Sequence, residues 1–120
     1  MSNDNNIETR IFRDRDGWNA TSAMDLTGDQ LLKIRTYRND RGLLRTTATV
    51  HTKVEGGLRH IMGFGTPGGD FSETLVVTKP ARVTEKVISA QHESVLKTIP
   101  GILSAVQAHY AKFPVSPALA

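Results

Sequence analysis

The sequence predicts an α+β domain, with an N-terminal β-hairpin and an antiparallel meander sheet followed by two C-terminal helices. Turn-forming residues recur at short intervals through the first two-thirds of the chain, as they do between the strands of a meander. After Pro80 helix-forming residues take over. With 120 residues and no cysteine, we expect a single domain (1–120) without disulfides, in which 1–6 and 114–120 are loose.

Six segments have the composition and alternation of β-strands, and polar or glycine-containing turns separate them. In order, the expected strands are 7–13, 18–26, 31–38, 43–54, 58–64 and 71–78. The first two form the N-terminal hairpin, and the others continue the meander.

The register between the fourth and fifth strands depends on the length of the loop that joins them. A three-residue loop over 55–57 would place Val54 opposite Leu58 and Val50 opposite Met62, whereas a two-residue loop would shift this register by one residue. Because a slip of one residue moves every side chain to the other face, the hydrophobic match favours the three-residue loop.

Two helices are expected after the last strand. The first spans about 81–99 and has a stripe formed by Ile88, Gln91, Val95 and Ile99. Pro100-Gly101 interrupts this pattern, and a clearly amphipathic helix follows over 102–113. Pro114 ends it.

The positive charge of the chain is concentrated in one block. The formal net charge is +3, yet residues 33–59 contain seven basic and two acidic side chains, a net of +5, while 1–32 contain three and six, a net of −3. Such a block attracts polyanions better than a diffuse surplus does.

Alternation along the third and fourth strands divides their residues between two faces. One face is apolar and continues into the fifth strand: Leu32, Ile34, Leu44, Ala48, Val50, Val54, Leu58, Met62 and Phe64. The other is basic and hydroxyl-rich: Lys33, Arg35, Tyr37, Arg45, Thr47, Thr49, His51, Lys53 and Arg59. A solvated sheet face is the alternative, but a solvated face would more often mix charges. The absence of acidic residues from these positions favours nucleic-acid contact.

The remaining motifs give no support for a cofactor, metal or catalytic site. Gly63 to Gly68 matches G-x-G-x-x-G but leads toward a strand, so a hairpin loop is the better interpretation than a dinucleotide site. His51 and His60 should lie on opposite faces, so no shared metal is expected, and no cofactor is implied. No nucleophile has a neighbouring base, so we expect neither an enzyme nor a small-molecule substrate. No apolar run is long enough for a membrane span, and the polar N-terminus does not resemble a signal peptide.

Two adjacent segments, Leu32-Lys33-Ile34-Arg35-Thr36-Tyr37-Arg38 and Thr47-Ala48-Thr49-Val50-His51-Thr52-Lys53-Val54-Glu55, are similar to the RNA-holding strands of a known family. The region from Gly69-Asp70-Phe71-Ser72 through Arg82-Val83-Thr84-Glu85-Lys86 to Ala90-Gln91-His92 looks like the last strand and first helix of divergent members. Over about Trp18 to Phe113, the chain resembles the coat protein of single-stranded RNA bacteriophages, mostly in architecture.

The resemblance implies an obligate homodimer whose helices pack on the partner's sheet, and then an icosahedral shell. The shell would assemble in the bacterial host's cytoplasm, become part of the virion, and bind single-stranded RNA with hairpins. RNA contacts would come from Lys33, Arg35, Tyr37, Thr47, Thr49, His51 and Lys53, with Arg45 on the same face. The segment from Gly63 to Gly69 would adapt at symmetry axes. The alternative hypothesis is a small dimeric regulatory protein that binds single-stranded nucleic acid and forms no shell.

Overall fold

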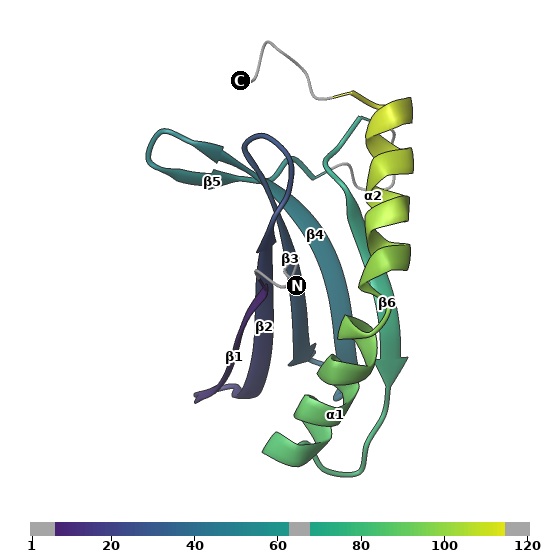
Figure 1. Ribbon diagram of the computed structural model, residues 1–120. Helices are drawn as coiled ribbons and strands as arrows, with labels where there is room; N and C mark the ends of the chain where they lie inside the picture. Colours follow the sequence, from purple (N-terminus) through teal and green to yellow (C-terminus); the bar gives the residue numbers. More distant parts are fainter. Residues whose placement is uncertain (1–6, 63–67, 115–120) are drawn as a thin grey trace.

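A computed structural model describes residues 7–62 and 68–114 as a six-stranded antiparallel sheet with two helices (Figure 1). The elements are β1 (Ile7–Asp14), β2 (Gly17–Asp25), β3 (Gln30–Arg38), β4 (Leu44–Val54), β5 (Gly57–Arg59), β6 (Ser72–Thr78), α1 (Glu85–Leu96) and α2 (Ile99–Lys112). The predicted α+β class and the order of strands before helices are confirmed.

The sheet is a meander from β1 to β4, and beyond it two strands share one edge of β4. β5 pairs with the last residues of β4, with Lys53 opposite Leu58, whereas β6 pairs with the first half, from Leu44 opposite Thr78 to Thr49 opposite Ser72. β4 therefore pairs with β3 on one side, and β5 and β6 follow one another along its other side.

The predicted register of the β4–β5 hairpin is wrong. Val54 lies opposite Gly57 rather than Leu58, because the loop has two residues, with Gly56 at a φ of 93° that suits a tight hairpin turn. β5 ends at Arg59, far short of the expected strand over 58–64. Three side chains expected in the core are exposed: Val54 by 37%, Leu58 by 48% and Met62 by 61%. The predicted core position of Phe64 lies outside the described residues.

The boundaries of the two helices differ from the prediction: α1 begins at Glu85 and not at 81, whereas α2 begins earlier, at Ile99 and not at 102. Thr84 caps α1, its hydroxyl accepting a hydrogen bond from the Val87 amide (3.2 Å), so residues 81–83 are not helical. Pro100 lies in the first turn of α2 instead of interrupting a helix. Proline suits this position, because the amide it lacks would have no partner within the helix.

Both helices cover one face of this chain's own sheet. α1 contacts β2, β3 and β4, and side chains of both helices share one core with those of β3 and β4. The core residues are Leu32, Ile34, Ala48, Val50, Phe71, Val95, Ile99, Ile102 and Val106. In Figure 1 the helices lie on one side of the sheet, while the β4–β5 hairpin extends away from them. The packing of the helices on a partner's sheet, expected from the resemblance, stays a prediction.

A chain of buried polar side chains crosses this otherwise apolar face under α1. The ring of His92 is hydrogen-bonded through Nε2 to Ser22 Oγ (2.7 Å) and through Nδ1 to Thr36 Oγ1 (2.8 Å). Thr36 in turn bonds Thr46 (2.8 Å), which accepts from Gln91 (3.1 Å). Each of these buried polar groups is thus satisfied, as burial requires.

Side chains of α2 hold both sides of the connection between β5 and β6. The Tyr110 hydroxyl donates to Asp70 Oδ1 and accepts from the Phe71 amide, both at 3.0 Å. Asp70 Oδ2 accepts from the Ile61 amide (2.9 Å), and His109 Nε2 donates to the Gly69 carbonyl (2.7 Å). Of the glycine-rich segment expected to adapt, residues 63–67 lie outside the described residues.

Candidate nucleic-acid interface

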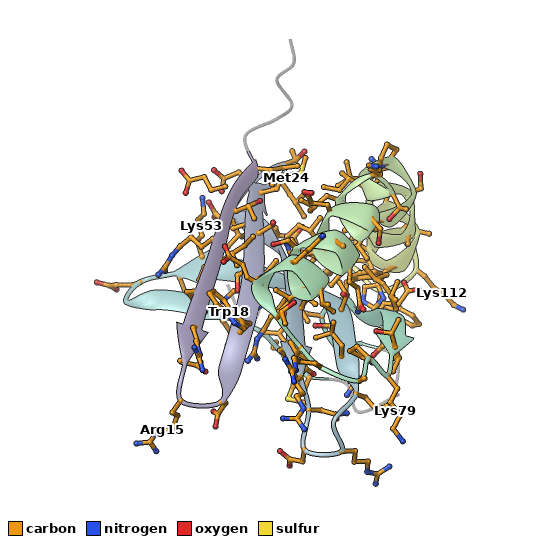
Figure 2. The ribbon with its side chains drawn as sticks, turned by 90° about the horizontal axis from the view of Figure 1, so that it is seen from below. Arg15, Trp18, Met24, Lys53, Lys79 and Lys112 are labelled. Carbon is orange, nitrogen blue, oxygen red and sulfur yellow. The ribbon has the colours of Figure 1, made fainter. Side chains whose placement is uncertain are left out.

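The eight predicted site residues all lie on the face of β3 and β4 that points away from the helices. The register pairs Lys33 with Thr49, Arg35 with Thr47 and Tyr37 with Arg45. His51 and Lys53 continue the same face toward the end of β4. Lys53 projects from this side of the sheet, whereas Lys112 lies on the helix side (Figure 2). We call these eight residues and their neighbours on this side the open face.

The neighbouring strands extend the open face in both directions. On one side, the register places Thr21 beside Arg35 and Arg10 beside Thr21. On the other side, it places Thr74 beside Thr47 and Ser72 beside Thr49. Cations and hydroxyl groups therefore lie next to one another across five strands of this face.

Several of these side chains are held in place by their neighbours. The Arg35 guanidinium stacks over the Tyr37 ring, 4.3 Å from its centroid. Arg45 Nη2 donates to Thr74 Oγ1 (2.7 Å), and Thr49 Oγ1 bonds His51 Nε2 (3.0 Å). Such contacts reduce the entropy that a ligand must remove from long side chains when it binds.

One corner of the open face is acidic. Asp25 of β2 forms an ion pair with Lys53 at 2.8 Å, and Glu8 of β1 lies on the same face opposite Ala23. The prediction that acidic residues are absent holds for β3 and β4, but β1 and β2 supply them. We therefore expect Lys33, Arg35 and Arg45 to contribute more of the available positive charge than Lys53.

Two placements differ from the sequence prediction, both because of the shifted β5 register. Arg59 lies opposite Thr52, so it is on the helix side and not on the open face. His60 does not lie across the sheet from His51, since their ring centroids are 4.9 Å apart. His60 Nδ1 donates to the Val50 carbonyl (2.6 Å) and so fills the gap between β5 and β6 along β4.

The charge state of His51 follows from this environment. Partial burial lowers the pKa of its imidazole, and the nearby His60 and Lys33 lower the pKa further, while Asp70 opposes them. His51 is therefore expected to be neutral at pH 7 and to act as a hydrogen-bonding group and not as a cation.

Together these residues can bind a chain of phosphates. Cations neutralise phosphate charge, hydroxyl groups exchange hydrogen bonds with phosphate and sugar oxygens, and the Tyr37 ring offers a surface for a base. Among the described residues, no group of three or more His, Asp or Glu side chains could hold a metal ion. Neither described helix has the length and apolar character needed to cross a bilayer.

Sequence reasoning missed part of the open face. It did not include Arg10, Thr21, Ser72 and Thr74, although the first two strands were expected as strands. Carrying the alternation of β3 across the hairpin would have found Thr21, which is one pairing step from Arg35. The β6 residues could not be placed in this way, because the meander predicted from the sequence continued from β5 to β6, which is wrong: β6 pairs with β4 directly.

Comparison with known proteins does not identify the chain: no family model, no curated protein and no solved structure matches it.

Proposed function

We propose that this chain is the structural coat protein of a single-stranded RNA bacteriophage. It assembles through dimers into an icosahedral shell and binds genomic RNA on the open face. The observation that carries the RNA-binding part is the pairing of cations with hydroxyl residues across β3 and β4, with Lys33 beside Thr49 and Arg35 beside Thr47.

The composition of the open face supports an RNA ligand over plain solvent. The centre of the face, on β3 and β4, carries Lys33, Arg35 and Arg45 and no carboxylate. A single-stranded nucleic acid offers phosphates for the cations and unstacked bases for Tyr37. The helices leave this face uncovered, so a bound strand would not disturb the core.

The outer edge of β6 supports self-association. Within the described residues β6 pairs only with β4, so its other edge is unpaired over Ser72–Thr78. Val77 on this strand is 49% exposed. Unpaired edge strands readily pair with another chain, and a twofold-related copy of β6 would make one continuous sheet with a doubled open face.

Size-exclusion chromatography with light scattering and the ratio of absorbance at 260 and 280 nm tests the proposal on the recombinant full chain. A coat protein gives a megadalton particle that contains RNA, and electron microscopy then shows closed shells. A peak at twice 13.1 kDa that binds RNA but forms no shell, even with added RNA, would favour the dimeric regulatory protein. A stable monomer without RNA affinity would contradict both.

A further inference from the structure

The end of the open face holds a hollow of about 520 Å³, formed where the β1–β2 and β3–β4 turns approach each other. This volume is within the range of about 300–1,000 Å³ that is usual for small-ligand sites. Its lining includes Arg35 and Tyr37 of the open face together with Asp16 and Asp40 of the two turns. The hollow is thus continuous with the surface on which we place the RNA strand.

Arg35 is fixed at the wall of this hollow by a residue that sequence reasoning did not select. The Asn19 side chain, 4% exposed, donates from Nδ2 to Asp14 Oδ2 (3.1 Å) and to the Gly17 carbonyl (3.2 Å). Both donors face oxygens, so the Asn19 carbonyl oxygen is left to accept from Arg35 Nη2 (3.3 Å). With Tyr37 beneath it, the guanidinium is held from two sides.

The charges around the hollow favour a base over a phosphate. Three carboxylates, Asp14, Asp16 and Asp40, line it against two guanidinium groups, Arg35 and Arg38. The hollow is therefore net negative by one charge, unlike the centre of the open face, and a phosphate entering it would meet carboxylate oxygens. A neutral group with both donors and acceptors fits better, because it can satisfy arginine and aspartate at once.

Guanine has this pattern of donors and acceptors. Its O6 and N7 acceptors are adjacent, as an arginine fork requires, and its N1–H and N2–H donors are adjacent, as a carboxylate requires. We propose that the hollow binds one unpaired guanine of the RNA strand, with Arg35 at O6 and N7, the Asp16 or Asp40 carboxylate at the N–H groups, and Asn19 as the residue that positions Arg35. This inference depends on the proposed function, since the strand is held by the open face.

Fluorescence anisotropy with labelled octamers of RNA tests the inference on the full chain. An oligouridine octamer with one central guanosine should bind about tenfold more tightly than the all-uridine octamer and than the same octamer with adenosine. Replacing guanosine by 7-deazaguanosine, which lacks N7, or by inosine, which lacks the N2 amino group, should each remove most of this gain. These comparisons need no protein variant, so they cannot fail through misfolding.

A pair of matched variants locates the site. The double variant Asp16→Asn with Asp40→Asn should abolish the preference for guanosine. Asp29→Asn with Glu55→Gln, which removes two carboxylates from turns at the other end of the sheet, should leave it intact. Equal binding of all octamers would overturn the guanine inference and leave the proposed function standing. A guanosine preference that survives the double variant would also overturn it. Absence of binding to every octamer would contradict the proposed function, and with it this inference.

Discussion

The imidazole of His92 is buried to 1% exposure between two hydroxyl groups of the sheet. Burial lowers its pKa below the ordinary 6.5, with Glu93 acting weakly in the opposite direction. The folded state therefore binds fewer protons than the unfolded state once the pH falls below about 6.5, and stability must fall with pH in that range. Above that pH both states are neutral at this residue, and its contribution is complete.

We expect the free energy of unfolding, measured by urea denaturation, to fall between about pH 7.5 and about pH 5.5, and to fall less in His92→Asn. His51→Asn is the paired comparison, because the pKa of His51 is also lowered, but this residue lies on the open face. If His51→Asn alone removed the whole pH dependence, the buried network would not be its source.

Sequence reasoning could not foresee the network around His92. Thr36 and Thr46 occupy positions of the apolar face, and a β-branched threonine there is ordinary in a strand. The partners of His92 are 70 and 56 residues away in the sequence, so only the packing of α1 on the sheet brings them together. The residues near His92 in the sequence form no pattern that would predict hydrogen bonds to the sheet.

Among the elements, α2 does more than cover the core, since Tyr110 joins it to the connection between β5 and β6. Burial and the hydrogen bond to Asp70 raise the pKa of Tyr110 to about 12, although the Phe71 amide and Arg59 oppose this. The hydroxyl therefore stays protonated and continues to donate over the whole physiological pH range.

Tyr110→Phe should lower the free energy of unfolding by about 1–3 kcal/mol, because it leaves the Phe71 amide and the Asp70 carboxylate without this partner. Urea denaturation measures the loss, and hydrogen exchange should show the Phe71 amide exchanging faster. Tyr37→Phe is the control, since Tyr37 contacts Arg35 through its ring and should change stability little. Equal losses in both variants would contradict the anchoring role.

The boundaries of the elements show what local pattern can and cannot predict. The strands from β1 to β4 and β6 follow from alternation and turn residues to within about two positions. The boundaries of β5 cannot be predicted in this way, because apolar pairs across a hairpin stabilise a register only where other side chains bury them. Val54 and Leu58 lie on a hairpin that extends beyond the helices, so the preference of Glu55-Gly56 for a tight turn decides the register.

For the molecule as a whole, the distribution of charge between the two sides of the sheet can be tested directly. Charge reversal of Arg10, Lys33 and Arg45 to glutamate should weaken binding of single-stranded RNA and reduce the slope of log K against log salt by about two, since each lost phosphate contact contributes about 0.7. Fluorescence anisotropy over a salt series measures both quantities.

The matched control reverses Lys79, Lys86 and Lys112, which are exposed and lie outside the open face. It makes the same change in net charge, so it should leave the salt slope nearly unchanged if binding depends on the open face. Equal effects of the two triple variants would mean that net charge, and not this face, attracts the RNA.

The alternation of β3 and β4 has a consequence for how such a protein can evolve. Residues that stabilise the fold and residues proposed to contact RNA occupy interleaved positions, as Ala48 and Val50 do with Thr47 and Thr49. Substitutions on the open face can accumulate without touching the core, so ligand preference is free to drift while the architecture persists. Loss or gain of one residue in β4 would turn the core residues beyond that point toward the open face and the open-face residues toward the core. Selection should therefore tolerate new side chains here and reject changes in length.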